Sequence, residues 1–314
     1  MSPDLLSGVL RKLRLRGAVC SDMECGGDFA TEAPAPAGAV LQADHVMGFH
    51  AVLRGRCWCS TPGGEWVLLE AGDFIIFPHG HACMLASSEG ATHARRANAG
   101  DTPATVRVLS GVLGCDAQPF NPLLATLPEM LSVRGAESGN WIACLLVQAI
   151  DALRARQPGA PAMLERMTEL MFLDALCRHT ALQGEERHGW LAGLQDRQIG
   201  RVLALIHEDP GHGWTGEELG ARVGLSRSVL YERFAALIGQ TPAQYLINWR
   251  MQVAAGRLRS SSATVAAIAC EVGYESEASF SRAFRRIVGA PPAAWRRAHA
   301  RAATSGGSGA GSSG

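Results

Sequence analysis

The sequence predicts an α+β multidomain chain with an N-terminal β-barrel, a helical linker and a C-terminal all-α region. Three observations predict this order. Short apolar segments separated by turn residues fill residues 40–112, apolar residues recur at three- and four-residue intervals from about residue 121, and one helical pattern occurs twice after residue 196. With 314 residues, 47% of them hydrophobic and 18% charged, the chain is long enough for more than one packed domain.

The first part of the chain has the pattern of short β-strands. The expected strands are Gly48–Leu53, Trp66–Leu69, Phe74–Phe77 and Thr105–Leu109. Turn residues separate these strands at Pro62–Gly64, Ala71–Asp73, Pro78–Gly80 and Ala99–Asp101. Turns at this spacing are typical of an all-β sandwich or barrel. We therefore expect residues 1–118 to form the first domain.

The period becomes helical in the middle of the chain. Leu123 and Leu127, and later Leu164 and Met171, belong to apolar stripes with helical spacing. A polar, glycine-containing segment at residues 183–189 indicates a second boundary. We therefore expect a helical linker at 119–192, an all-α domain at 193–301 and a flexible tail at 302–314, where the last residues are Gly, Ser, Ala and Thr only.

Composition excludes several classes of protein. No stretch reaches the roughly 18 uninterrupted apolar residues of a spanning helix, and Asp4, Arg11 and Lys12 interrupt the place where a signal peptide would be apolar. The nine cysteines are an odd number in a long chain, which favours reduced thiols over a disulfide framework. We expect a cytoplasmic protein without membrane contact.

The charge is unevenly distributed along the chain. Residues 1–194 carry 15 basic and 20 acidic groups, whereas residues 195–314 carry 14 basic and 9 acidic groups. All 14 cations of the second part are arginines, although Lys12 is the only lysine anywhere, so a codon bias explains the choice of residue equally well. The position of the positive charge favours a polyanionic partner for the C-terminal region.

One pattern occurs twice in the C-terminal region. Leu219–Gly224 precedes Leu230 and Phe234, and 49 residues later Ile268–Gly273 precedes Phe280 and Phe284. In each copy a small residue permits a close helix crossing, a glycine permits a sharp turn, and Ser226 or Ser276 is suited to cap the next helix. The pattern predicts two helix-turn-helix units.

A helix is expected between the two units. Thr215 and Glu218 form a possible capping box before the first unit, and Pro242 begins a helix over Ala243–Leu258. Sixteen residues span about 24 Å at 1.5 Å per residue. Successive major-groove faces lie roughly 34 Å apart along B-DNA, so a rigid pair of units is suited to two adjacent turns of one duplex.

The C-terminal hundred residues resemble the AraC/XylS family of transcription regulators. The residues that carry the resemblance are Ala269–Tyr274, Ser279–Arg285, Gly289–Pro292 and Trp295–Arg296 in the second unit, and Trp214, Leu225–Ser228, Phe234, Gly239–Pro242 and Tyr245–Leu246 in the first. The resemblance implies sequence-specific binding to double-stranded promoter DNA, contact with RNA polymerase, activation as the usual outcome, and a homodimer formed through helices 121–182. Packing of those helices on the barrel of the same chain is the alternative.

The buried positions of each second helix determine which side chains face outward. The side chains opposite the core, at positions where the family places DNA contacts, are Ser228, Tyr231 and Glu232 in the first unit and Glu277, Ala278, Ser281 and Arg282 in the second. Arg282 is suited to guanine, the glutamates to cytosine N4 and Ala278 to a thymine methyl group. Arg227, Arg285 and Arg286 are expected on phosphates. Each glutamate is equally well explained as a solvated surface residue.

The β region resembles the cupin superfamily. Gly72, Pro78–Gly80 and Cys83 follow the spacing of the second cupin motif, with cysteine in place of its histidine, and Glu65 with Gly72 matches the end of the first motif. The earlier histidine pair of that motif is missing. The resemblance implies a barrel that senses a signal, with no cofactor expected.

Three kinds of sensor chemistry remain open for the barrel. His50, His81 and Cys83 are candidate ligands of a soft metal, an organic ligand is an alternative, and oxidation of a cysteine is the third. Cys20 and Cys25 are expected to be exposed, while Cys57 and Cys59 share one face of a strand. The remaining helical cysteines, expected in the core, are Cys144, Cys177 and Cys270.

The sequence therefore predicts a transcription regulator controlled by a small molecule or by redox chemistry, and not an enzyme. A cupin-type metalloenzyme carrying a DNA-binding module is the alternative, disfavoured by the missing histidine pair. A DNA-repair methyl acceptor needs a four-cysteine metal cluster, whose spacing this chain does not provide.

Overall fold

The computed structural model describes residues 6, 15–36, 41, 43–91, 105–115, 119–138, 141–182 and 189–305. The described chain forms two compact units. One is β-rich and comprises the described residues of 15–115 together with 127–182, and the other is helical and comprises residue 6, 119–126 and 189–305. The predicted fold class, a β domain followed by helical units, is confirmed.

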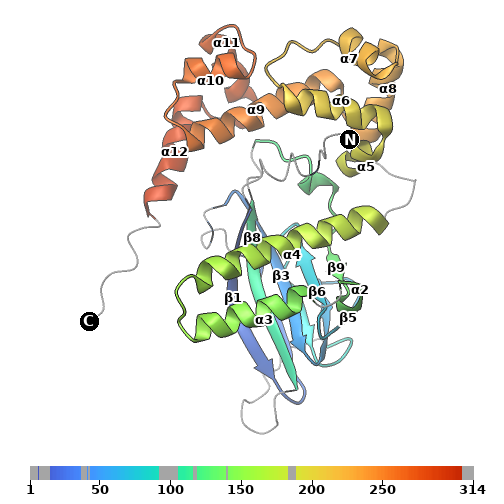
Figure 1. Ribbon diagram of the computed structural model, residues 1–314, viewed down its shortest axis with the longest axis vertical. Coiled ribbons are helices and arrows are strands. Elements are labelled where there is room, and N and C mark those ends of the chain that lie inside the picture. The colour runs from blue at the N-terminus through green and yellow to red at the C-terminus, as the bar shows by residue number, and fades with distance from the viewer. Residues whose placement is uncertain are drawn as a thin grey trace. The chain divides into compact units, whose positions relative to one another are not determined.

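Two antiparallel sheets make up the β domain (Figure 1). The first sheet has the order β1 (Arg16–Cys25), β8 (Val106–Cys115), β3 (His45–Arg54), β6 (Phe74–Phe77) and β9 (Leu131–Val133). The second has the order β2 (Ala30–Ala33), β7 (Cys83–Ala86), β4 (Arg56–Ser60) and β5 (Val67–Glu70). All four strands predicted from the sequence are present. The first and the last of them correspond to β3 and β8, which are longer than expected.

Glycines with positive φ occur in three of the predicted turns. Gly63, Gly72 and Gly80 have φ of 76°, 95° and 69°. At Gly80 a Cβ would lie 2.7 Å from the carbonyl oxygen of Val46, so that turn has no space for a side chain. The fourth predicted turn, at residues 99–101, lies outside the described residues.

The inward faces of the two sheets form the core of the β domain. Cys57, Cys59 and Cys83 are buried there among Val52, Leu69, Ile75, Phe77 and Leu85. Trp58 is only half-buried, as the alternation along a strand predicts. The core therefore contains three cysteines from two paired strands, with Cys25 packed against its edge.

Three helices follow in the same unit, namely α2 (Gly135–Ser138), α3 (Trp141–Arg154) and α4 (Ala160–Leu182). Helices α3 and α4 pack against one another and on the first sheet (Figure 1). At Gly17 of β1 a side chain would collide with Thr168 of α4, which shows how closely helix and strand approach. Ile142 and Leu146 of α3 and Met171 and Phe172 of α4 are buried in this unit.

The helical unit contains the elements from η2 (Leu124–Thr126) to α12. They are α5 (Trp190–Gln195), α6 (Arg197–Glu208), α7 (Gly216–Val223), α8 (Arg227–Ile238), α9 (Pro242–Ser260), α10 (Val265–Glu271), α11 (Glu277–Val288) and α12 (Pro292–Ser305). The predicted helix between the two helix-turn-helix units is therefore present as α9, and at 19 residues it is longer than expected. Because α12 ends at Ser305, the first residues of the predicted tail are helical, whereas residues 306–314 and most of the boundary segment 183–189 lie outside the described residues.

Helix α9 contributes side chains to two separate cores. Its first half buries Tyr245 and Trp249 beside Trp190 and Phe234, and its second half packs on the core residues Phe280, Phe284 and Trp295. The first core also contains polar groups. Trp190 donates from Nε1 to the Tyr245 hydroxyl oxygen at 2.8 Å, and His207 contacts the same oxygen through Nε2 at 2.8 Å while it stacks on Trp249.

The expectation that the helical cysteines belong to the core is wrong. Cys144, Cys177 and Cys270 are exposed. The reason is that the apolar stripes of α3, α4 and α10 are wider than the surface that each helix buries, so residues at the edge of a stripe face solvent.

Candidate functional site

Local capping explains why each pair of helices turns where it does. Ser226 accepts a hydrogen bond from the Val229 amide at 3.3 Å, and Ser276 accepts one from Ser279 at 3.2 Å, as predicted. Gly224, which ends α7, has φ of 71°, a conformation that disfavours any residue with a side chain. At Gly220 a Cβ would lie 2.6 Å from the carbonyl oxygen of Leu225, so the predicted small residue is required. The two helix-turn-helix units are confirmed.

The second helix of each unit, α8 or α11, has one face in the core and the other in solvent. Leu230 and Phe234 are fully buried, and so are Phe280 and Phe284. The predicted DNA-contacting side chains lie on the outer faces. Ser228, Glu232, Glu277, Ala278, Arg282 and Arg285 are exposed, and Tyr231 and Ser281 are half-buried. The structure therefore makes all of them available to a ligand, and their contacts with DNA remain a prediction.

Arg227 is held in place before any ligand binds. Its Nη1 lies 2.8 Å from Glu217 Oε1, and its guanidinium lies 5.5 Å from the centre of the Tyr231 ring. Both members of the ion pair are more than half exposed, so the pair contributes little to stability. Arg227 therefore lies exposed at the first residue of α8, and its contact with a phosphate stays a prediction.

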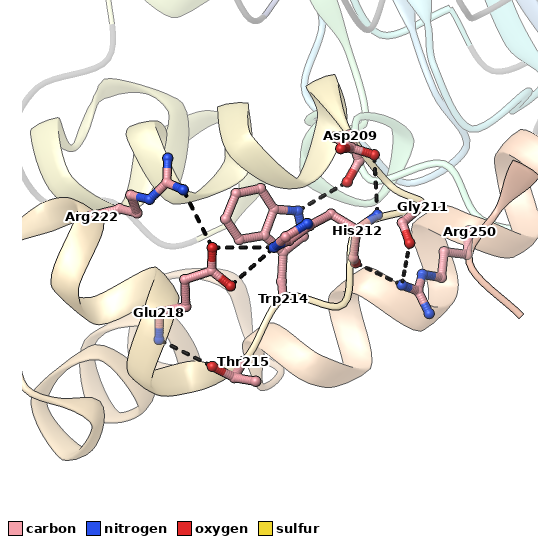
Figure 2. A network of polar contacts seen from close by, with 8 residues as sticks. All are labelled: Asp209, Gly211, His212, Trp214, Thr215, Glu218, Arg222 and Arg250. Atoms are coloured by element: carbon pink, nitrogen blue, oxygen red, sulfur yellow. Dashed lines mark hydrogen bonds and ion pairs between the residues drawn. The ribbon is translucent and has the colours of Figure 1, made fainter.

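A polar network surrounds the loop between α6 and α7 (Figure 2). Thr215 caps α7 by accepting from the Glu218 amide at 3.1 Å, but the Glu218 carboxylate contacts His212 at 3.0 Å and Arg222 at 3.4 Å. Of the predicted capping box, therefore, the structure forms the hydrogen bond to the Thr215 side chain, while the Glu218 side chain bonds elsewhere. The Trp214 indole donates to the Asp209 carbonyl oxygen at 2.9 Å, and its ring contacts that of His212 at a tilt of 60°, which fixes the course of the loop.

Arg250 joins the two helix-turn-helix units. It projects from α9 and donates from Nε to the Pro210 carbonyl oxygen at 2.7 Å and from Nη2 to that of His212 at 2.8 Å, both in the loop of the first unit (Figure 2 shows the latter). Its Nη1 lies 3.5 Å from the carbonyl oxygen of Gly273, in the turn of the second unit. Partial burial lowers the pKa of this guanidinium, and the nearby Tyr274 and Asp209 offset only part of this effect.

The backbone itself touches at this junction. A side chain at Gly273 would collide with the carbonyl oxygen of Gly211, and one at Gly211 would lie 2.8 Å from that of Glu271. The α6–α7 loop and the α10–α11 turn therefore meet without intervening side chains, and Arg250 bonds both. This contact limits how far the two units can move relative to one another.

In the β domain, three strands bring a histidine, a cysteine and a serine together. His50 of β3 lies with Nε2 3.1 Å from the Cys83 sulfur of β7 and with Nδ1 2.7 Å from the Ser110 oxygen of β8. Both His50 and Cys83 are buried. Cys59 of β4, which pairs with β7, is buried in the same cluster as Cys83.

These contacts separate the acidities of the buried thiols. The hydrogen bond from Cys59 and the neighbouring His50 lower the pKa of Cys83 despite its burial, whereas the same hydrogen bond and burial raise that of Cys59. Burial raises the pKa of Cys57 to about 12. Cys83 is therefore the thiolate of the cluster and Cys59 is its donor.

The other predicted sensor residues do not join this cluster in the expected way. His81 is exposed on the loop before β7, so the structure does not form the metal site predicted from His50, His81 and Cys83. In the described part of the chain, no group of three or more His, Cys, Asp or Glu side chains is arranged to hold a metal ion. Cys20 is exposed, as expected, but Cys25 is only half-exposed, and partial burial raises the pKa of both. Neither is activated as a thiolate.

Comparison with known proteins identifies the family. Residues 4–181 match the cupin family, and residues 219–298 match a helix-turn-helix domain. A putative AraC-like transcription regulator of Streptomyces antibioticus is 33% identical over 94% of this chain and 98% of its own length. The chain belongs to the AraC-like transcription regulators with an N-terminal cupin domain.

Other AraC-like regulators are similar along most of their length. The transcriptional regulator AlkR of Acinetobacter baylyi is 27% identical over 82% of this chain and 90% of its own, and the RCS-specific transcriptional activator RclR of Escherichia coli is 28% identical over 93% and 97%. Among solved structures, the DNA-binding domain of AdpA, determined with a target DNA, is 32% identical over 34% of this chain and 96% of that one, with a TM-score of 0.32. This AraC-like protein is therefore a DNA-binding transcription regulator with a cupin-type sensing domain.

Sequence reasoning missed two residues of these sites. Arg250 lies among the buried residues of α9, and Ser110 is a polar residue inside the apolar run of β8. A polar residue in an apolar segment is the signal that marks both, but its partners come from distant segments and cannot be read from local spacing.

No helix in the described ranges is long and apolar enough to cross a membrane.

Proposed function

We propose that this regulator places α8 and α11 in two successive major grooves of promoter DNA, and that a small molecule or an oxidant acting on the barrel controls this binding. The supporting observation is that α9 carries both reading helices, each with a free polar face, and that Arg250 and the Gly211–Gly273 contact hold the two units together. A rigid pair of helices of this kind suits two grooves on one side of the duplex.

Replacing Arg282 by alanine tests base reading directly. Arg282 is exposed on α11, and loss of a bidentate contact with guanine is expected to weaken binding to the cognate site by about 1–3 kcal/mol while binding to random duplex changes little. A gel-shift titration measures both affinities. Arg297→Ala, an exposed arginine of α12 outside the reading faces, serves as the control. Equal affinity of the Arg282 variant and the wild type for the cognate site would exclude this role.

We assign no catalytic function to the barrel and propose no resident cofactor. The alternative, a cupin metalloenzyme, needs about three imidazoles and a carboxylate around a metal. Here the two ring nitrogens of His50 contact Ser110 and Cys83, and His79 Nε2 lies 3.0 Å from the Leu127 carbonyl oxygen. Turnover and DNA-binding assays on one preparation distinguish the two functions.

The regulator is proposed to act as a cytoplasmic homodimer. Trp141 of α3 and Met163 and Leu170 of α4 are large apolar residues with 37–40% exposure, and the last two lie seven residues apart on one face of α4. A second copy of the chain would cover these residues at the cost of little reorganisation. The related RclR is named an activator, which supports activation through contact with RNA polymerase as the outcome of DNA binding.

Introducing a charge on this face is expected to break the dimer. Leu170→Glu places a carboxylate in the proposed interface, so the dissociation constant of the dimer is expected to rise at least tenfold, because burial of an unpaired charge costs several kcal/mol. Sedimentation equilibrium measures the change. Val229→Glu, which adds the same charge at an exposed apolar residue of α8 outside the proposed interface, is the control. If Leu170→Glu leaves the dissociation constant of the dimer unchanged, the dimer interface does not include this face of α4.

A further inference from the structure

We propose that Cys83 is a peroxide-reactive thiolate whose oxidation is resolved by Cys59 in the interior of the barrel. The inference rests on the proposed control by a barrel signal and gives that signal a chemical class, a hydroperoxide. It starts from geometry, because the Cys83 sulfur lies 3.1 Å from His50 Nε2, and Cys83 is diagonal to Cys59 on the same buried face of the β4–β7 ladder. Two other strands, β3 and β4, therefore contribute to the environment of one sulfur atom of β7.

His50 is oriented for this role from its far side. Ser110 lies 2.7 Å from Nδ1, which leaves Nε2 directed at the Cys83 sulfur. With both ring nitrogens protonated, His50 donates to the Ser110 oxygen and to the Cys83 sulfur, so the buried charges form a thiolate–imidazolium pair. The lowered pKa of Cys83 agrees with this arrangement.

The pair carries out the oxidation step with balanced atoms. The Cys83 thiolate attacks one peroxide oxygen, the O–O bond breaks, and the leaving oxygen takes the proton of His50 Nε2. With hydrogen peroxide the products are a sulfenic acid on Cys83, a neutral His50 and water. The Cys59 sulfur then attacks the Cys83 sulfur, an S–S bond forms as the S–O bond breaks, and the hydroxyl group leaves with the Cys59 proton as a second water. Two thiols are oxidised and one peroxide is reduced.

The burial of the site selects its oxidant. Cys83 is 2% exposed and Cys59 is fully buried, so bulky electrophiles are excluded and hydrogen peroxide is the suitable probe. Exposed Cys20 is accessible, but burial around its sulfur raises its pKa, so it is a poorer nucleophile near neutral pH.

Formation of the disulfide must move the two strands. In the β4–β7 ladder Cys59 is opposite Leu85, so Cys83 occupies the diagonal position two residues away on the same face. Diagonal partners have Cα atoms about 7–8 Å apart, which is longer than most disulfides span, at about 4.4–6.8 Å. The S–S bond therefore draws β4 and β7 together, and this change of the barrel is the signal.

The test uses the full-length protein, reduced and then treated with hydrogen peroxide, with digestion under non-reducing conditions and mass spectrometry of the cysteines. We expect a Cys59–Cys83 disulfide in the wild type, a trappable sulfenic acid on Cys83 in Cys59→Ser, and no oxidation of Cys59 in Cys83→Ser. Cys57→Ser, a buried cysteine of the same strand, is the matched control and should form the disulfide normally. Loss of the disulfide in the Cys57 variant, or oxidation of Cys20 before Cys83, would overturn the assignment.

A pH profile on the wild type tests the thiolate without any substitution. A depressed pKa means that Cys83 is ionised at neutral pH and is protonated as the pH falls through its value in the folded protein. The rate of peroxide reaction at Cys83 should therefore be constant from pH 8 to 7 and should decline only in the acid range. A rate that still rises tenfold per pH unit above pH 7 would show an ordinary thiol and refute the proposal.

The regulatory consequence is measured on promoter DNA. Affinity for a cognate fragment should change at least fivefold after peroxide treatment, should return with dithiothreitol, and should not change in Cys83→Ser. If the disulfide forms without any change in affinity, the sensing role is refuted. If reduced wild type does not prefer the promoter fragment at all, DNA reading itself fails, and the sulfur chemistry is judged separately by mass spectrometry.

Discussion

Gly273→Ala is expected to lower the free energy of unfolding of the helical unit by roughly 2–5 kcal/mol, whereas Gly224→Ala lowers it by about 1–2 kcal/mol. The two glycines occupy the same place in the two helix-turn-helix units, and both have left-handed φ, 80° and 71°. An alanine at either site would be strained by this left-handed conformation. At Gly273 its Cβ also collides with the Gly211 carbonyl oxygen and lies 2.7 Å from Arg250 Nη2, whereas at Gly224 nothing lies within 4 Å.

Urea unfolding of the two variants measures the difference, and gel shifts show its effect on DNA binding. Because the collision lies at the junction of the units, Gly273→Ala is expected to weaken binding to a complete operator more than its loss of stability alone explains. Gly289→Ala, at the end of α11 with φ of 85° and open space around it, is a second control. Equal losses at residues 224 and 273 would show that the contact with Gly211 does not constrain the turn.

Arg250→Met is expected to weaken binding to an operator with two correctly spaced boxes about 10–100-fold, because hydrogen bonds of a charged donor contribute about 1.5–3 kcal/mol each. Methionine keeps the apolar stem but leaves the carbonyl oxygens of Pro210 and His212 without this donor. The first unit then moves more freely relative to the second. Affinity for a single box is expected to change little, and operators with altered spacing should become better tolerated relative to the native one.

Gel shifts on operators with zero, one or two inserted base pairs separate this positioning role from general loss of structure. Arg257→Met is the matched control, because Arg257 lies on the same helix and forms an exposed ion pair with Glu271 at 2.9 Å. Arg250→Lys should recover only part of the affinity, since an ammonium cannot reach several carbonyl groups in one plane. A uniform loss for one box and two boxes alike would mean that Arg250 acts only on stability.

The sequence allows much of the reading unit to be predicted because its determinants are local. Ser226 and Ser276 cap helices that begin at the next residue, and the buried pairs four residues apart, such as Phe280 and Phe284, determine the outer face. Each of these effects acts within one or two helical turns. Local spacing was enough to find them, and membership of the AraC-like family agrees with it.

The barrel site could not be predicted in the same way. Cys83 follows His50 by 33 residues in the sequence, and Ser110 follows it by 60. Only the pairing of β3 with β8, together with packing of the two sheets, brings the three residues into contact. The sequence suggested His81 as the partner because it is near Cys83 along the chain. His81, however, lies in the loop before β7, where strand alternation does not determine the direction of a side chain, and it faces solvent.

Sharing α9 between two cores has a consequence for evolution and for engineering of this regulator. Tyr245 and Trp249 anchor one end of the rod and Ala255 and Leu258 the other, so neither half retains a complete interior when the chain is cut between them. Removing one residue from the middle of α9 would rotate one reader against the other by about 100° and shorten their separation by about 1.5 Å. In the proposed two-groove complex, the length of this single helix would set the operator phasing, and insertions there would require matching changes in the promoter.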